Sequence, residues 1–285
     1  LQVGQGEAVG VYMPMVPEAV AAVIAIAKVG AVFIPLFSGY GADAVAKRLN
    51  DCRAKVLLTA DGFRRRGALV EMKKTADAAR TQTPALRQTV MLRLEHCEVP
   101  WNPAHDLDWK IALCPFESTF DALPVDSEHP FMIIYTSGTT GKPKGAVHVH
   151  GGFLVKIAEE VLHQGDYHAG DVLHWVTDMG WIMGPWEVVG TLALGGTILV
   201  YDGAIDYPGP DRLWSLVARH KVSFLGVSPT LIRALMKSGD EPVARHDLSS
   251  LRAIGSTGET WNPVPWMWCF EKVGHGRVPI INLSG

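Results

Sequence analysis

The sequence has 285 residues, of which 48% are hydrophobic and 19% are charged, an ordinary composition for a globular protein with a sizeable core. The formal net charge of -3 argues against a nucleic-acid-binding protein, and the basic run Arg64–Arg66 is too short to reverse this. The most hydrophobic run, Ala19–Phe37, is interrupted by Lys28, Gly30 and Pro35. It falls short of the roughly 20 apolar residues of a membrane span.

Cysteine usage and the two ends of the chain give further expectations. The four cysteines are scattered and form no CxxC pattern, which favours reduced thiols in a cytoplasmic protein over a disulfide framework or a zinc site. The N-terminus has no signal-peptide pattern. The chain starts without methionine and its last residues, VPIINLSG, are typical of a strand that enters a loop. We therefore expect a piece of a longer protein.

Short hydrophobic strands alternate with helices in the first 60 residues. Pro17 suits the first turn of a helix, and Gly30 is a natural stop after it. The predicted elements are a strand at Ala8–Pro14, a helix from Pro17 to Val29, a strand at Ala31–Phe37, a helix at Asp43–Cys52 and a strand at Lys55–Ala60.

The same alternation returns in the second half of the chain. Helices are predicted at Phe153–His163, Pro185–Leu194, Asp211–His220, Pro229–Gly239 and Val264–Val273, and strands at Val172–Thr177, Thr197–Tyr201, Val222–Val227, Leu251–Thr257 and Val278–Ser284. This order predicts an α/β fold, with two alternating runs that form parallel-rich sheets covered by helices. We predict a first subdomain at 1–130, with a peripheral insertion at about 61–128 that contains one strand at Gln88–Leu94, and a second subdomain at 131–285.

A glycine-rich segment, FMIIYTSGTTGKPKGAVHVH at Phe131–His150, joins the two runs. Glycines allow backbone N–H groups to approach anionic oxygens closely, and hydroxyl and lysine side chains add donors and positive charge. The residues of this kind are Thr136, Ser137, Gly138, Thr139, Thr140, Gly141, Lys142 and Lys144. The composition favours a loop that binds a triphosphate.

The spacing excludes a Walker loop, which needs GxxxxGK followed by Ser or Thr and then a helix. Pro143 follows Gly141–Lys142, and no glycine stands five residues before Gly141. The residues after the loop alternate as in a strand. We therefore predict a strand-loop-strand, in which backbone N–H groups, hydroxyls and lysines replace the helix dipole.

On these residues the sequence resembles the AMP-forming acyl-CoA synthetases, whose signature is similar to YTSGTTGKPKG. The segments VYMPMVPEAVAAVIAIAKVGAVFIPLFSGY, VHGGFL, DMGWIMGP, LSSLRAIGSTGE and NLSG resemble successive blocks of the short-chain branch, which includes acetyl- and acetoacetyl-CoA synthetases. Together they cover nearly the whole chain in order. The resemblance implies that a carboxylate attacks the α-phosphate of Mg-ATP, and that the thiol of CoA then displaces AMP.

The resemblance also implies roles for individual residues in nucleotide binding. Thr136 through Lys144 would hold the β- and γ-phosphates. Gly258, Glu259 and Thr260 match the block that lines the adenine pocket, with Thr260 where acetyl-CoA synthetases usually carry proline. Asn282 matches a position that contacts the adenine amino group in many relatives.

Substrate and CoA residues are implied in the same way. Trp181, Ile182, Met183 and Gly184 match the block that shapes the acyl pocket, which Thr257 and Gly285 would complete, and Gly39 with Arg65 in the Arg64–Arg66 run matches a region that meets CoA. Acetyl-CoA synthetases carry tryptophan at the position of Gly285, so a longer acid than acetate is expected, although Met183 is bulkier than the usual threonine. The Mg²⁺-binding glutamate and the catalytic lysine of the family would lie beyond Gly285.

Other readings stay open on the sequence alone. The glycine-rich segment could be a surface hairpin, and His148 and His150, two residues apart on one predicted strand, could chelate a metal, although we expect no metal site there. The chain could also be a non-catalytic nucleotide or CoA binder, or part of an adenylating enzyme with a different acceptor. An α/β-hydrolase is disfavoured, because the nearest approach to GxSxG, at Gly226–Thr230, lacks the second glycine.

Overall fold

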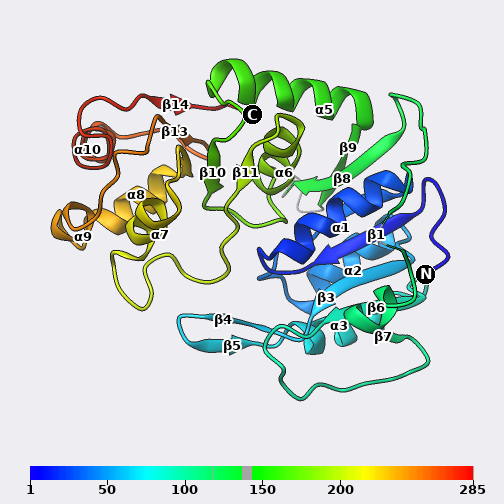
Figure 1. Cartoon of the computed structure of the whole chain (residues 1–285). Coiled ribbons are helices and arrows are strands. Elements are labelled where there is room, and N and C mark those ends of the chain that lie inside the picture. Colours follow the sequence, from blue (N-terminus) through cyan, green and yellow to red (C-terminus); the bar gives the residue numbers. More distant parts are fainter. Residues whose placement is uncertain (118, 137–142, 285) are drawn as a thin grey trace. The chain divides into compact units, whose positions relative to one another are not determined.

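The computed structural model describes residues 1–117, 119–136 and 143–284, and the chain divides into two compact units (Figure 1). The first unit comprises Leu1–Phe153 and Asp178–Pro185, and the second comprises Leu154–Thr177 and Trp186–Gly285. Each unit has its own sheet of mainly parallel strands with helices packed on it. The predicted α/β class, with two alternating runs, is confirmed.

The first unit contains a seven-stranded sheet in the order β7-β6-β3-β1-β2-β8-β9. Its neighbouring strands are parallel except for β8 and β9, which pair antiparallel. The strands are β1 (Ala8–Tyr12), β2 (Val32–Pro35), β3 (Val56–Ala60), β6 (Gln88–Leu92), β7 (Asp106–Asp108), β8 (Pro130–Thr136) and β9 (Lys144–Val149). The antiparallel pair confirms the predicted strand-loop-strand, whose residues 137–142 lie outside the described part of the chain.

Helices and a hairpin complete the first unit. These elements are α1 (Pro17–Lys28), α2 (Ala42–Asp51), α3 (Met72–Arg80), α4 (Trp109–Leu113) and the hairpin of β4 (Phe63–Arg65) with β5 (Ala68–Val70). Helix α1 begins on Pro17, and Gly30, with a φ of +66°, turns the chain after it in the left-handed region. Helices α2 and α3 pack against each other.

The segment 61–128 contributes more strands than the single one that the sequence predicts. Strand β6 pairs with β3 over five residues, and β7 pairs with β6, so both extend the main sheet. The boundary between the two halves also differs from the predicted one at 130/131. Because β8 pairs with β2, residues 131–153 belong to the first unit.

The second unit contains a five-stranded sheet in the order β11-β10-β12-β13-β14, with every neighbouring pair parallel. The strands are β10 (Val172–Trp175), β11 (Thr197–Ile198), β12 (Phe224–Val227), β13 (Ala253–Ser256) and β14 (Ile280–Asn282). Helical segments are α5 (His150–Glu159), η1 (Glu160–Gln164), α6 (Met183–Ala193), α7 (Arg212–His220), α8 (Pro229–Met236), α9 (Glu241–Ala244), α10 (Pro263–Trp268) and η2 (Cys269–Val273), of which α5 and α6 begin in residues of the first unit.

Two glycines on neighbouring strands make room for a tryptophan in the second unit. A Cβ on Gly226 would lie 2.0 Å from the ring of Trp175, and one on Gly255 would lie 2.8 Å from it. The ring stacks on Phe224 and meets Trp186 edge-on, with centroid distances of 6.3 and 5.3 Å. On the other face, α7, α8 and η2 bury a cluster of aliphatic side chains around Trp214. The sheet is therefore packed on both faces, as parallel sheets usually are.

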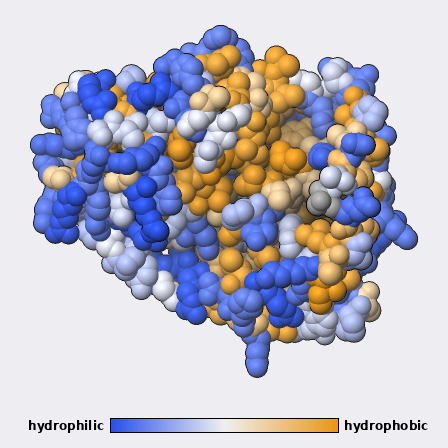
Figure 2. All heavy atoms as spheres, in the orientation of Figure 1, coloured by the Kyte–Doolittle hydropathy of each residue, from blue (hydrophilic) through white to orange (hydrophobic). Residues whose placement is uncertain are grey.

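Hydrophobic residues also reach the surface. On the face drawn in Figure 2 they appear in orange among hydrophilic residues. The exposed ones include Val155 and Leu162 on α5 and η1, and a run from Ile111 to Leu123 that contains Phe116 and Phe120. In the part of the chain that the structure describes, no helix is both long and apolar enough to cross a membrane.

Candidate functional site

Residues predicted to shape an acyl pocket lie beside the carboxyl end of β2 in the first unit. The segment Asp178–Pro185 belongs to this unit, and its Trp181 ring packs on Phe37, two residues beyond β2, with centroids 5.6 Å apart. Trp181 remains 55% exposed, whereas Met183 is buried. Ligands of open α/β sheets bind outside the carboxyl ends of the strands. The arrangement presents a large aromatic face at that edge.

The glycines of DMGWIMG allow this close approach. A Cβ on Gly180 would lie 2.2 Å from the backbone nitrogen of Phe37, and a Cβ on Gly184 would lie 2.7 Å from the carbonyl oxygen of Asp178. Real Cβ atoms do not approach backbone so closely, since the overlap strains a packed region. Glycine at position 180 therefore lets the segment lie against Phe37, and glycine at position 184 lets the segment turn back onto Asp178.

The residues predicted to meet CoA lie in the same unit. A Cβ on Gly39 would lie 2.6 Å from the ring of Phe37, so only a glycine leaves room for this ring against the backbone at position 39. Arg65 ends strand β4, in a hairpin that the sequence did not predict, and its side chain is exposed. Arg64 is paired with Glu95 at 2.9 Å. The CoA role of Gly39 and Arg65 stays a prediction.

The two ends of the glycine-rich loop are fixed by the β8–β9 pair. Thr136 ends β8, Lys144 begins β9, and the two residues pair across the ladder with exposed side chains. The preceding residue, Tyr135, donates a hydrogen bond of 2.6 Å to Asp51 on α2. The predicted phosphate contacts at Ser137, Gly138, Thr139, Thr140, Gly141 and Lys142 lie outside the described residues.

Arg48 on α2 connects the base of this loop with the segment after β2. Its guanidinium lies over the ring of Tyr40 at 4.1 Å and over that of Tyr135 at 5.7 Å, and it donates to the Tyr40 hydroxyl at 3.0 Å. Burial, and then the neighbouring Asp51 carboxylate, raise the pKa of Tyr135 far above its usual value, so its hydroxyl stays a donor. No motif or periodicity in the sequence predicts these contacts.

Residues predicted for the acyl pocket and for adenine lie together at the carboxyl edge of the second unit's sheet. Thr257 follows β13 and donates to the carbonyl oxygen of Leu283 at 2.8 Å, just beyond Asn282 at the end of β14. Gly258 has a φ of +99°, and no atom lies within 4 Å of the place of a Cβ. Its glycine is needed for the backbone turn, which leaves the site open.

Glu259 is held in place by α8. Its carboxylate accepts from the backbone N–H of Thr230 at 2.7 Å, from the Thr230 hydroxyl, and from Arg233 at 2.7 Å. The Thr230 hydroxyl, and then the Arg233 guanidinium, hold the pKa of this carboxyl below its usual value. Thr260 is exposed next to it, and Gly285 lies outside the described residues. Sequence reasoning brought these residues together but missed Arg233 and Thr230.

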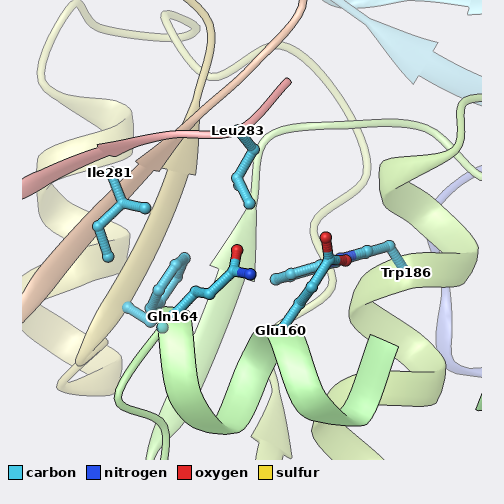
Figure 3. A pocket seen from close by; sticks show the side chains of 7 residues that line it. Glu160, Gln164, Trp186, Ile281 and Leu283 are labelled. Carbon is cyan, nitrogen blue, oxygen red and sulfur yellow. The ribbon is translucent and has the colours of Figure 1, made fainter. Parts of the chain in front are cut away.

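The crevice in Figure 3 is a weaker candidate in the same unit. It lies beside Ile281 and Leu283, with Gln164 and the Glu160–Trp186 pair on its other side (Figure 3). The indole N–H of Trp186 donates to Glu160 at 3.1 Å. Side chains leave no space for a water molecule in this crevice, so we assign no ligand to it.

The histidine pair does not form the predicted two-residue repeat on one strand. Strand β9 ends at Val149, and His150 begins α5, while His148 pairs with Met132. Burial lowers the pKa of both imidazoles, and for His150 nearby His129 adds to this effect. Across the described ranges, no group of three or more His, Cys, Asp or Glu side chains could hold a metal ion.

Comparisons with known proteins agree with this geometry. The family described as "AMP-binding enzyme" matches residues 1–285. The chain is 41% identical to an acetyl-coenzyme A synthetase of Rhodopirellula baltica over 283 residues, and 41% identical to one of Pyrobaculum arsenaticum over 280 residues. These matches cover 99% and 97% of this chain but 42% of either relative, so the chain spans about two fifths of their length.

A solved structure shows the same fold. The acetoacetyl-CoA synthetase from Streptomyces lividans superposes with a TM-score of 0.91 at 32% sequence identity. The match covers 100% of this chain and 44% of that one. The two alternating runs thus occur together, in this order, in that solved structure.

Proposed function

Because the chain belongs to the AMP-binding enzyme family, we propose that the whole protein activates a short-chain carboxylic acid with ATP and transfers the acyl group to CoA. The observation that carries this proposal is the match of the full chain to the family, with acetyl-coenzyme A synthetases 41% identical to it. In the first step a carboxylate oxygen bonds to the α-phosphorus and pyrophosphate leaves. In the second step the CoA sulfur bonds to the acyl carbon and AMP leaves.

Positioning and charge matter more in this reaction than acid–base catalysis, since two anions must meet. We assign the phosphates to the loop that Thr136 and Lys144 border, and the adenosine to Gly258, Glu259, Thr260 and Asn282. The acyl chain is assigned to Trp181, Ile182, Met183, Thr257 and Gly285, and CoA to Gly39 and Arg65. Magnesium would accompany ATP, although in the described part of the chain no group of three or more His, Cys, Asp or Glu side chains could hold it.

Glu259 and its partners support the adenosine assignment. Arg233 and Thr230 fix the carboxylate, so the turn at Gly258 keeps one shape at the edge of the sheet. A turn that is already ordered before ligand binding costs less entropy when the ligand arrives.

We also propose that the protein works in the cytoplasm.

Exchange of labelled pyrophosphate into ATP tests the proposal on the full-length protein. We expect exchange that depends on an added acid from the series acetate to valerate or on acetoacetate, because only the adenylation step is needed. Acyl-CoA formation is then measured with CoA present. Absence of exchange with every acid contradicts the short-chain proposal, and exchange without acyl-CoA formation indicates another acceptor.

Replacing Gly285 with tryptophan tests the acyl assignment. We expect the preference to move toward acetate, with kcat/KM for longer acids falling by about tenfold or more relative to acetate. One methylene changes the binding free energy in a hydrophobic pocket by about 1–3 kcal/mol, and an indole fills far more space than a methylene. Ratios of kcat/KM over the acid series provide the measurement. An unchanged ratio would remove Gly285 from the pocket.

A further inference from the structure

Asp178 is a buried carboxylate in the first unit to which neither the family resemblance nor the sequence assigned a role. Only 8% of the residue is exposed. It accepts hydrogen bonds from the Ser38 N–H at 3.3 Å, from the Ser38 hydroxyl at 2.5 Å and from the Gly180 N–H at 2.8 Å. Ser38 lies 140 residues earlier in the chain, just beyond the carboxyl end of β2.

These bonds fasten the segment that carries Trp181. The N–H of Trp181 donates to the carbonyl oxygen of Asp178 at 3.0 Å, and the N–H of Gly184 donates to that of Trp181 at 3.0 Å. The Trp181 ring then rests on Phe37, the residue before Ser38. Asp178 thus joins the two backbones whose aromatic rings meet, and it sets where the exposed indole lies.

The two oxygens of Asp178 suit this contact. The backbone N–H groups of Ser38 and Gly180 donate to Oδ1, and the Ser38 hydroxyl, which can donate or accept, lies against Oδ2. Burial raises the pKa of Asp178, while the Ser38 and Gly180 bonds and the charge of Arg65 act in the opposite direction. A carboxyl group that is buried at a desolvation cost and tied to a distant segment points to a positioning task.

We propose that Asp178 is a positioning and specificity-determining residue, whose carboxylate holds Trp181 against Phe37 and thereby fixes one wall of the acyl site. It acts through Trp181 and does not touch the reacting atoms. The inference rests on the proposed function, because it assigns the wall to the same acyl site. Substituting Asp178 should therefore change the selectivity among carboxylic acids and leave nucleotide binding unchanged.

Two variants and two independent readouts test this in the full-length protein. Asp178→Asn keeps the shape but replaces one acceptor oxygen with an amide N–H₂ and removes the possibility of a negative charge, and Ser38→Ala removes only the hydroxyl and keeps the backbone bond. The first readout is the fluorine resonance of Trp181 after 5-fluorotryptophan labelling, assigned with Trp181→Phe. The second is kcat/KM over the acid series, with KM for ATP measured alongside.

We expect Asp178→Asn to shift or broaden the Trp181 resonance, and to raise KM for the preferred acid roughly tenfold, since one acceptor oxygen is lost. KM for ATP should stay within about twofold, and the ratio between long and short acids should flatten. Ser38→Ala should act in the same direction more weakly. If Asp178→Asn does not fold, Ser38→Ala carries the test, because its backbone contact remains.

A matched buried aspartate separates positioning from stability. Asp61 in the same unit accepts N–H bonds from Gly62, Leu94, Glu95 and Cys97, and Asp61→Asn should lower stability without changing the acid ratios or the Trp181 resonance. An unchanged Trp181 resonance in both Asp178→Asn and Ser38→Ala would overturn the proposal, as would unchanged acid ratios. If the wild type shows no exchange but the resonance moves, the proposed function has failed and the positioning by Asp178 stands.

Discussion

Replacing Lys73 with methionine is expected to destabilise the first unit by about 3–5 kcal/mol, the usual result of removing one partner from a buried ion pair. The Lys73 ammonium is buried and binds Asp106 at 3.0 Å, Asp77 at 2.5 Å and the carbonyl oxygen of Pro100 at 3.2 Å. Asp106 is also buried, so its carboxylate would lose the ammonium group that lies 3.0 Å from it. Thermal unfolding followed by circular dichroism should show a midpoint lower by roughly 10 °C.

The same helix supplies the control. Lys74 is one residue further along α3 and pairs with Glu71 at 3.3 Å, but both side chains are more than half exposed. Exposed pairs contribute about 0–1 kcal/mol, so Lys74→Met should leave the midpoint nearly unchanged. Equal midpoints for Lys73→Met and Lys74→Met would contradict the argument. Adding Asp106→Asn to Lys73→Met should restore part of the loss, because the unpaired charge is then removed.

Acid should weaken the Lys73 contact in a defined direction. Burial opposes ionisation of Asp106, but the Asn102 N–H and the Lys73 ammonium outweigh burial and hold its pKa below the usual 3.8. A lowered folded-state pKa gives stability that is present above the unfolded pKa and is lost as the pH falls through the folded one. The difference between wild type and Lys73→Met should therefore shrink below about pH 4, and a constant difference would argue against the ion pair as its cause.

Local patterns predicted the elements better than their long-range partners. Helix α1 follows from Pro17, a hydrophobic run and Gly30, and the gathering of Thr257 with Asn282 follows from parallel strands that end at one edge. Strand β7 has only three residues, Asp106–Asp108, and one hydrophobic side chain, too few for a pattern that predicts a strand of the main sheet. Its pairing with β6 depends on contacts of the surrounding fold.

The candidate site divides in the same way. Contiguous motifs predicted residues that could contact ligand, such as Gly258 and Trp181. The residues that hold their neighbours lie far away in the sequence: Arg233 is 26 positions from Glu259, and Ser38 is 140 positions from Asp178. No periodicity links such pairs, since each bond forms only after the sheet has set the distance between the two segments.

Glu187 in the second unit is the other position where we expect a large effect, and here a substitution should stabilise. The residue is fully buried, its Oε2 accepts from the Trp175 N–H at 3.0 Å, and its Oε1 has no partner. Burial raises the pKa of this carboxyl well above its usual 4.5, and the single N–H bond offsets this only in part. Above pH 4.5 the carboxyl group is ionised in the unfolded chain but must take up a proton to be buried in the fold. This proton uptake lowers the free energy of unfolding.

The sign of the pH effect follows from this raised pKa. The stability associated with Glu187 is fully present below the unfolded pKa near 4.5 and is lost as the pH rises through the folded value. Glu187→Gln keeps an oxygen for the Trp175 N–H and cannot ionise. At pH 8 we expect it to be more stable than the wild type by about 1–3 kcal/mol, within the range found when buried charges are replaced by neutral groups.

Denaturant unfolding of the second unit's tryptophan signal between pH 4 and pH 8 measures this difference. The gain should vanish near pH 4, where the wild-type acid is protonated in both states, because the two proteins then bury equivalent neutral groups. Glu159→Gln, at an exposed position of the same unit, should show no gain at either pH. A gain for Glu187→Gln that persists unchanged at pH 4 would mean that packing, and not suppressed ionisation, stabilises the variant.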